Sequence, residues 1–125
     1  MLDRELELLS HISKLALEKK AINLIAIDLR SMEYIADFFL IATGFNDVHI
    51  YAIAHHIVRE TKGTLFKVWH KEGLKPGSTW ICLDFAEIIM HIMSEKKRKY
   101  YDIENLWSDA PRFDLTSIPD LDVRG

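Results

Sequence analysis

The feature that most constrains the fold is a nearly unbroken apolar run at residues 37–43, which reads Asp-Phe-Phe-Leu-Ile-Ala-Thr. A strand with one face in water alternates apolar and polar residues, whereas a strand covered on both faces stays apolar along its length. Gly44 ends the run, and Asn46 or Asp47 is placed to cap a helix at about 48–62. The pattern therefore predicts an interior strand of an α/β sheet.

Periodicity predicts the other elements. On residues 2–20, apolar side chains recur at helical spacing along one arc and charged side chains occupy the other, which is typical of an amphipathic helix. Ser94 is expected to cap a last helix that ends near Trp107, and the segment 70–78 is expected to be a loop or a hairpin connection. Together the predicted elements are helices at 2–20, 48–62 and 95–107 and strands at 24–29, 37–43, 65–69, 79–85 and 86–93.

This order of elements predicts an α/β fold with a single mixed five-stranded sheet flanked by helices. We expect one domain at residues 1–110 and an irregular C-terminal tail at 111–125. On the strand at 79–85, Trp80, Cys82 and Asp84 should share one face of the sheet. On the strand that follows, His91 should share a face with Glu87, Ile89 and Met93, opposite Ile88, Met90 and Ile92.

Composition excludes several classes of protein. The net charge of -3 gives no long-range attraction for bare nucleic acid. Cys82 is the only cysteine, so a disulfide within the chain is excluded and a small buried thiol is expected. The first residues lack the features of a secretory signal or transit peptide, and no stretch has the length of a membrane span. We therefore expect a cytoplasmic protein, and nothing in the sequence predicts a cofactor.

Two clusters invite a ligand-binding interpretation that their spacing does not favour. The turn at Gly44 leads into a helix, but it lacks further glycines and a Lys-Ser/Thr pair, so a helix cap explains it better than a phosphate loop. His49 and His56 are seven residues apart, which is too far for one metal ion. We expect His49 to belong to a polar flank available to a partner.

Asp84 and His91 lie on consecutive predicted strands and could form a general acid–base pair. No serine or cysteine nucleophile with a supporting base accompanies them. The alternative is that Asp84 accepts hydrogen bonds from a turn or a histidine, and a structural or docking role is favoured over catalysis.

The last predicted helix carries aromatic residues on two stripes. Helical spacing predicts that Tyr100, Ile103 and Trp107 lie in the core, while Tyr101 and Glu104 form a neighbouring stripe. That stripe is typical of a protein interface, with burial in the core as the alternative. The basic run at 96–99 is expected to be solvated, or to contact RNA phosphates if the partner is a ribonucleoprotein.

Several segments, taken in order, resemble the ribosomal silencing factor family, RsfS, also called Iojap. The match spans roughly residues 28–110 and departs from the family at Asn46-Asp47-Val48, at Phe85, where Tyr is usual, and at Ala86, where Gly is usual. The matching segments are Ala36-Asp37-Phe38-Phe39-Leu40-Ile41-Ala42-Thr43-Gly44, His49 with Ala52-Ile53-Ala54, Glu72-Gly73, Trp80-Ile81-Cys82-Leu83-Asp84-Phe85, Ile89-Met90-His91-Ile92, and Arg98-x-Tyr100-Tyr101-Asp102-Ile103-Glu104-x-Leu106-Trp107.

The resemblance implies a cytoplasmic factor that binds the large ribosomal subunit through a ribosomal protein, number fourteen in its series. The contact is expected at the face of the large subunit that meets the small subunit. Occupying that face would block joining of the small subunit and repress translation when nutrients are scarce. A role in large-subunit maturation is also attributed to relatives. It implies no cofactor and a topology similar to that of nucleotidyltransferases. The expected partner-binding residues are Trp80, Asp84, His91, Tyr101 and Glu104.

Two rival hypotheses follow from the same resemblance. Nucleotidyl transfer requires a Gly-Ser turn followed by a pair of metal-binding aspartates. Here Phe45 follows Gly44, and an Asp-x-Asp pair occurs only at Asp120 and Asp122 in the predicted tail. A homodimerisation module is the second rival, since relatives are reported as dimers.

Overall fold

Every residue of strand β2 (Phe38–Thr43) is buried, which confirms the interior strand predicted from its apolar run. The strand pairs in parallel with β5 (Ile88–Met93) and antiparallel with β1 (Ile22–Asp28). It thus lies in the middle of a mixed sheet, as expected for an α/β fold.

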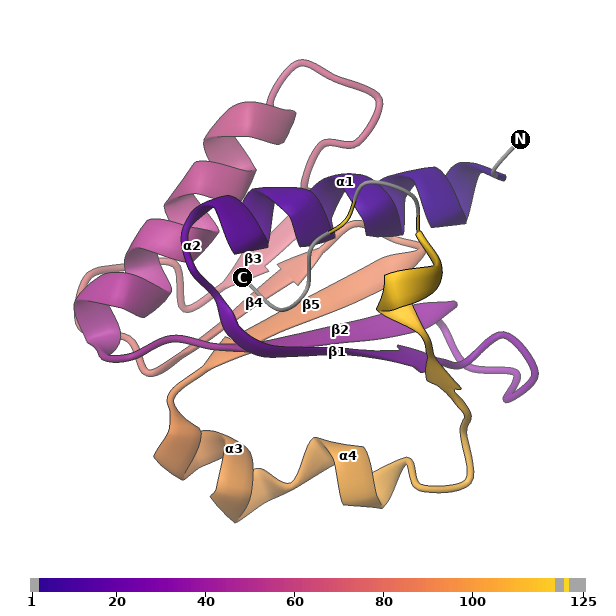
Figure 1. The fold of residues 1–125 in the computed structure, drawn as a ribbon. Coiled ribbons are helices and arrows are strands. Elements are labelled where there is room, and N and C mark those ends of the chain that lie inside the picture. Colours follow the sequence, from indigo (N-terminus) through magenta and orange to yellow (C-terminus); the bar gives the residue numbers. More distant parts are fainter. Residues whose placement is uncertain (1–2, 119–120, 122–125) are drawn as a thin grey trace.

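The structure is a computed structural model that describes residues 3–118 and residue 121. The sheet has six strands in the order β3-β4-β5-β2-β1-β6, with helices on both faces (Figure 1). The remaining elements are α1 (Arg4–Glu18), α2 (Asp47–Thr61), β3 (His70–Glu72), β4 (Trp80–Asp84), α3 (Glu95–Tyr101), α4 (Ile103–Leu106), β6 (Arg112–Phe113) and a 3-10 helix, η1 (Leu115–Ser117).

The two faces of the sheet are covered differently. Helices α1 and α2 lie together on one face and bury the larger apolar cluster, whereas α3 and α4 lie on the opposite face (Figure 1). On that second face the buried cluster is smaller and includes Ile41, Met93 and Ile103, with Trp107 partly buried against it. Burial alternates along β4 as predicted, with Ile81 and Leu83 buried toward α2.

The strand predicted at 65–69 is wrong, and a strand forms at 70–72 instead. After α2 the Thr64 hydroxyl donates to the Thr61 carbonyl at 2.7 Å and accepts from the amide of Phe66 at 3.0 Å, which turns the chain. The free edge of β4 then pairs with β3 from His70 to Glu72. Residues 70–72 have no strand preference of their own, so the pairing with β4 determines that they form a strand.

The helix predicted from 95 to 107 is broken at Asp102. This residue has φ 46° and ψ 54°, a left-handed conformation, and it separates α3 from α4. The break rotates the second half of the segment, so the predicted stripe does not hold. Ile103 is buried, but Tyr100 is 79% exposed and is not a core residue.

The sheet also has one strand more than the five predicted. Residues Arg112 and Phe113 pair with Ile27 and Ala26 of β1, and Leu115 and Ile118 are buried in the larger cluster. The described part of the segment after residue 110 is therefore ordered against the sheet, where an irregular tail was expected. Its apolar residues are too few and too irregularly spaced to show a period.

Candidate protein-docking surface

The surface begins with three side chains on the face of the sheet covered by α3. The antiparallel register pairs Cys82 of β4 with His91 of β5, and Trp80 lies two residues earlier on the same face. The Trp80 indole Nε1 donates to His91 Nδ1 at 3.1 Å, and Cys82 Sγ lies 3.3 Å from the same nitrogen. A single acceptor atom therefore fixes the orientation of the indole ring.

His91 is 8% exposed and is a neutral acceptor in this arrangement. Burial lowers the pKa of His91 to about 4 and raises the pKa of the Cys82 thiol to about 11, so neither group is charged near neutral pH. With Nδ1 accepting, the ring proton lies on Nε2, which is buried and has no hydrogen-bond partner. The Phe39 ring lies edge-on to the imidazole, with the ring centroids 5.0 Å apart.

Tyr101 of α3 extends this cluster to the solvent. Its ring centroid lies 4.8 Å from that of Trp80 and 4.9 Å from that of Tyr100, and the Tyr101 side chain is 47% exposed. We call Trp80, Tyr100 and Tyr101 the aromatic ridge. Exposed aromatic side chains that are rigidly supported are typical of the centres of protein interfaces, because they bury much area at little entropic cost.

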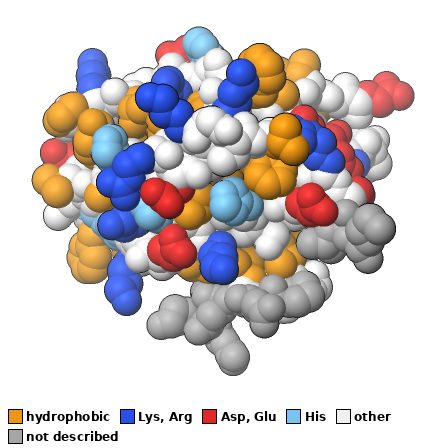
Figure 2. Space-filling view, turned by 90° about the horizontal axis from the view of Figure 1, so that it is seen from above, with side chains coloured by type: hydrophobic (Ala, Val, Ile, Leu, Met, Phe, Trp, Pro, Cys, Tyr) orange, Lys and Arg blue, Asp and Glu red, His pale blue; other side chains and the backbone are white. Residues whose placement is uncertain are grey.

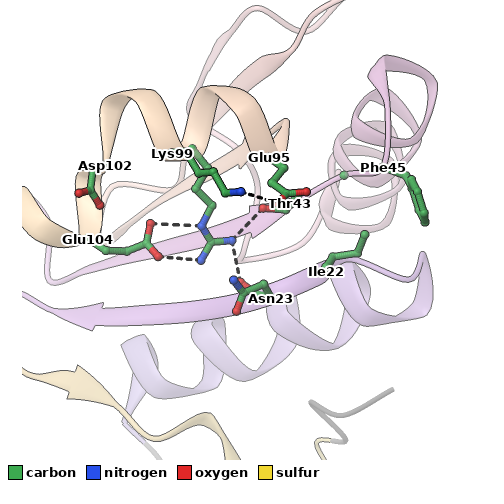
Figure 3. Close-up of a pocket in the computed structure, with 10 residues that line it drawn as sticks. Ile22, Asn23, Thr43, Phe45, Glu95, Lys99, Asp102 and Glu104 are labelled. Carbon is green, nitrogen blue, oxygen red and sulfur yellow. Dashed lines mark hydrogen bonds and ion pairs between the residues drawn. The ribbon is translucent and has the colours of Figure 1, made fainter.

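Beside the ridge, Glu104 is held by the buried guanidinium of Arg98. Arg98 Nε donates to Glu104 Oε1 at 3.2 Å and Nη2 donates to Oε2 at 3.1 Å. Arg98 Nη1 donates to the Asn23 carbonyl at 2.7 Å and to Thr43 Oγ1 at 2.9 Å (Figure 3). A helix residue is thereby joined to the beginning of β1 and the end of β2.

The Arg98 network forms one wall of a pocket of about 480 Å³. Ile22 and Phe45 line the other side, and Lys99 is paired with Glu95 at its rim at 3.0 Å (Figure 3). The cationic groups of this wall are thus already matched by carboxylates within the chain.

Asp84 lies apart from the other predicted partner-binding residues. Its register partner is Ile89, and its carboxylate accepts from the amide of Ala86 at 2.7 Å in the turn between β4 and β5. The acid–base pair with His91 does not form, and the turn-capping alternative describes Asp84 instead. Ala86 itself has φ 76°, a conformation that favours glycine.

Four of the five predicted partner-binding residues lie in one region of the structure, and Asp84 does not. Trp80, His91 and Tyr101 come together, and Glu104 is linked to them through α3, but His91 lies beneath the surface. Sequence reasoning missed Arg98, which was placed in a solvated basic run and is 6% exposed. Two signals could have found it: Arg98 begins a segment that matches the family, and it is an arginine among lysines, since arginine is preferred for buried, forked hydrogen bonding.

The helix start at α2 is used internally. Gly44 N donates to the Met93 carbonyl, Phe45 N donates to His49 Nδ1 at 2.7 Å, and His49 N donates to Asn46 Oδ1. His49 Nε2 lies 2.7 Å from the carbonyl of Lys19 at the end of α1. His49 therefore connects two helices, which differs from the partner-facing role predicted for it, and these amides are not free for a phosphate.

The described residues contain no group of three or more His, Cys, Asp or Glu side chains placed to hold a metal ion. Asp120 and Asp122 lie outside the described residues. In the described part of the chain, no helix is long and apolar enough to cross a membrane. On the α1 side of the molecule, charged side chains of both signs alternate with apolar ones (Figure 2).

Comparisons with known proteins give one consistent family. The family model described as "Ribosomal silencing factor during starvation" matches residues 3–124. The ribosomal silencing factor RsfS of Halalkalibacterium halodurans is 31% identical over 101 residues, covering 81% of this chain and 86% of that protein. A crystal structure of a protein from Bacillus halodurans covers 87% of this chain and 98% of its own, with a TM-score of 0.75 at 27% identity.

A mouse relative carries a different name. The protein called "Mitochondrial assembly of ribosomal large subunit protein 1" is 30% identical over 74 residues, which is 58% of this chain and 32% of that protein. The chain is thus similar to proteins named for ribosomal silencing and to a protein named for assembly of the large ribosomal subunit.

Proposed function

Because the chain belongs to the ribosomal silencing factor (RsfS) family, we propose that it binds the large ribosomal subunit in the cytoplasm and blocks joining of the small subunit. The immediate partner is the large-subunit ribosomal protein numbered fourteen in its series. Binding represses translation when nutrients are limiting. The mechanism is steric, so affinity depends on buried contacts and no covalent bond changes.

The observation that carries this proposal is the aromatic ridge at the edge of a family-matched fold. Trp80 is oriented by His91 and packs on Tyr101, and Tyr101 exposes about half of its side chain. A ridge of this kind can enter a shallow depression on a partner without reorganising first, which lowers the entropic cost of binding. Glu104 supplies a polar group at its margin, and Asp84, at the other end of β4, stays a separate candidate.

The Arg98–Glu104 pair also determines the charge of the surface. Each carboxylate oxygen of Glu104 accepts one bond from the guanidinium, so the pair is close to neutral as a unit. The cations nearby are Lys96 and Lys99, which are exposed, and Lys97, which is half-buried, and they would provide the minor contact with ribosomal RNA. Lys97 Nζ already lies 5.9 Å from the centroid of the Tyr101 ring.

Co-sedimentation with isolated subunits tests the proposal. We expect the protein to pellet with the large subunit and not with the small subunit, and Trp80→Ala and Tyr101→Ala to reduce the bound fraction. The matched control is Trp69→Ala, which removes an exposed tryptophan (65%) next to Asp84, at the opposite end of β4 from Trp80. Binding to neither subunit, or equal binding to both, would contradict the proposal. Normal binding by all ridge variants would place the docking surface elsewhere.

Large-subunit assembly is the second candidate function. The name of the mouse relative favours it, and the same surface could hold a maturing subunit. Depleting the protein from cells separates the two functions: an assembly role predicts accumulation of precursor large subunits during growth, whereas silencing alone predicts excess translation in starvation. The topology similar to that of nucleotidyltransferases stays a prediction. Nucleotidyl transfer and homodimerisation are rival hypotheses, and nucleotide incorporation and sedimentation of the pure protein test them.

A further inference from the structure

The buried guanidinium of Arg98 connects the candidate surface to the sheet. The side chain uses four of its five N–H groups: Nε on Glu104, Nη1 on Asn23 and Thr43, and Nη2 on Glu104. These partners come from β1, from β2 and from the segment after α3. A residue with 6% exposure cannot itself contribute much contact area to a partner.

Two residues near this network, Asn23 and Asp102, have left-handed backbone conformations. Asn23 has φ 52° and lies where the β1–β2 register shifts, and its carbonyl accepts from the guanidinium. Asp102, at φ 46°, forms the break between α3 and α4, directly after Tyr101 and two residues before Glu104. Asn and Asp adopt this conformation more readily than other non-glycine residues do, and the contacts around them help to hold it. The Arg98 guanidinium bonds the carbonyl of the first, Asn23, and the side chain of Glu104, which lies two residues after the second.

We propose that Arg98 is a positioning residue of the docking surface, which fixes the α3–α4 break and thereby sets Tyr101 and Glu104 in their binding geometry. This inference rests on the function proposed above. Because both Glu104 oxygens are engaged by Arg98, Glu104 meets a partner in one orientation and with its charge largely matched. A lysine at position 98 would keep the charge but could not span Glu104, Thr43 and Asn23 at once.

The test measures affinity for isolated large subunits with variants of two strengths. Arg98→Met removes the network, Arg98→Lys keeps only its charge, and Thr43→Val removes one of the four hydrogen bonds with little change in shape. The matched control is Thr61→Val, which also deletes a buried threonine hydroxyl, bonded at 2.8 Å to the carbonyl of Ile57 in α2 on the other face. Urea unfolding identifies the conditions in which each variant is folded.

We expect folded Arg98→Met to bind about tenfold or more weakly, Arg98→Lys nearly as weakly, and Thr43→Val several-fold more weakly. Thr61→Val should bind as the parent does, even though it is less stable. A merely structural role would predict that Thr43→Val and Thr61→Val behave alike. If Arg98→Met does not fold, the comparison of Thr43→Val with Thr61→Val decides the matter.

A double-mutant cycle adds a readout that loss of stability does not mimic. If Arg98 acts through Glu104, Glu104→Gln weakens binding in the parent but adds nothing in the Arg98→Lys background. Equal and additive effects would overturn the positioning role, as would parental affinity in folded Arg98 and Thr43 variants. Failure of the parent protein itself to bind large subunits would instead refute the proposed function.

Discussion

The buried imidazole of His91 should make stability depend on pH in a way that a single substitution removes. In the folded protein the pKa of His91 is lowered from 6.5 to about 4 by burial, so the unfolded chain binds a proton that the folded chain excludes. Stability from this residue is complete above about pH 6.5, and it is lost as the pH falls toward 4. At 1.36 kcal/mol per pH unit, the loss reaches about 3 kcal/mol.

The geometry explains why the charged form is excluded. Protonation of Nδ1 would place a third donor opposite Trp80 Nε1 and the Cys82 thiol, which now both point at that atom. The thiol offers no relief, because its raised pKa keeps it protonated throughout this range. His91→Gln retains an acceptor for the indole but cannot titrate, so it isolates the effect.

Urea unfolding at pH 7 and pH 4, followed by circular dichroism, measures the difference directly. The parent should lose about 3 kcal/mol more than His91→Gln between these two values, because all other groups titrate alike in both proteins. If the parent and the variant lose the same free energy of unfolding, His91 is not a buried neutral acceptor and the support assigned to Trp80 is wrong.

Three further predictions follow from the surface and its turn. Trp80→Ala should weaken binding to large subunits by about 2 kcal/mol, or about thirtyfold, in a co-sedimentation titration in which Trp69→Ala is unchanged. Glu104→Lys should cost about 3–5 kcal/mol of stability in urea, because it leaves the buried charge of Arg98 facing another cation; a fully stable variant would contradict the pairing. Ala86→Gly should raise the unfolding free energy by about 1 kcal/mol by relieving its positive φ, and no gain would argue against that conformation.

Local signals in the sequence predicted the elements that depend on neighbours along the chain. Asn46 and Ser94 cap α2 and α3 with the hydrogen bonds expected of them, to the amides of His49 and Lys97. The apolar run at 37–43 predicted an interior strand of an α/β sheet, and β2 confirms the prediction. The pattern is readable because every side chain of a strand covered on both faces is buried.

Contacts between distant segments account for what sequence reasoning missed. Arg98 meets an acceptor 75 residues earlier in the chain, a contact that the spacing of residues along α3 does not show. The sequence predicted how side chains alternate along each of the two strands but not that His91 and Trp80 share a face, and Phe39 from a third strand packs against His91. The polar residue His91 on the apolar strand β5 therefore pointed to the cluster with Trp80 and Tyr101, but the sequence did not show which of these side chains reaches the solvent.

The reverse error occurred at His49, one of the histidines of α2. His49 lies on a polar flank of its helix, which favoured an exposed role, yet both ring nitrogens are engaged by the backbone of Phe45 and Lys19. Only the position of α1 against α2 determines this, and that packing is not written in the spacing of either helix.

The most direct test of the account is a subunit-joining titration. Purified small and large subunits are mixed with increasing amounts of the protein, and joined ribosomes are separated from free subunits on a gradient. We predict that joined ribosomes decline in proportion to large subunits occupied, and that Trp80→Ala at the same concentration leaves them intact. Full joining in the presence of saturated large subunits would contradict a steric mechanism.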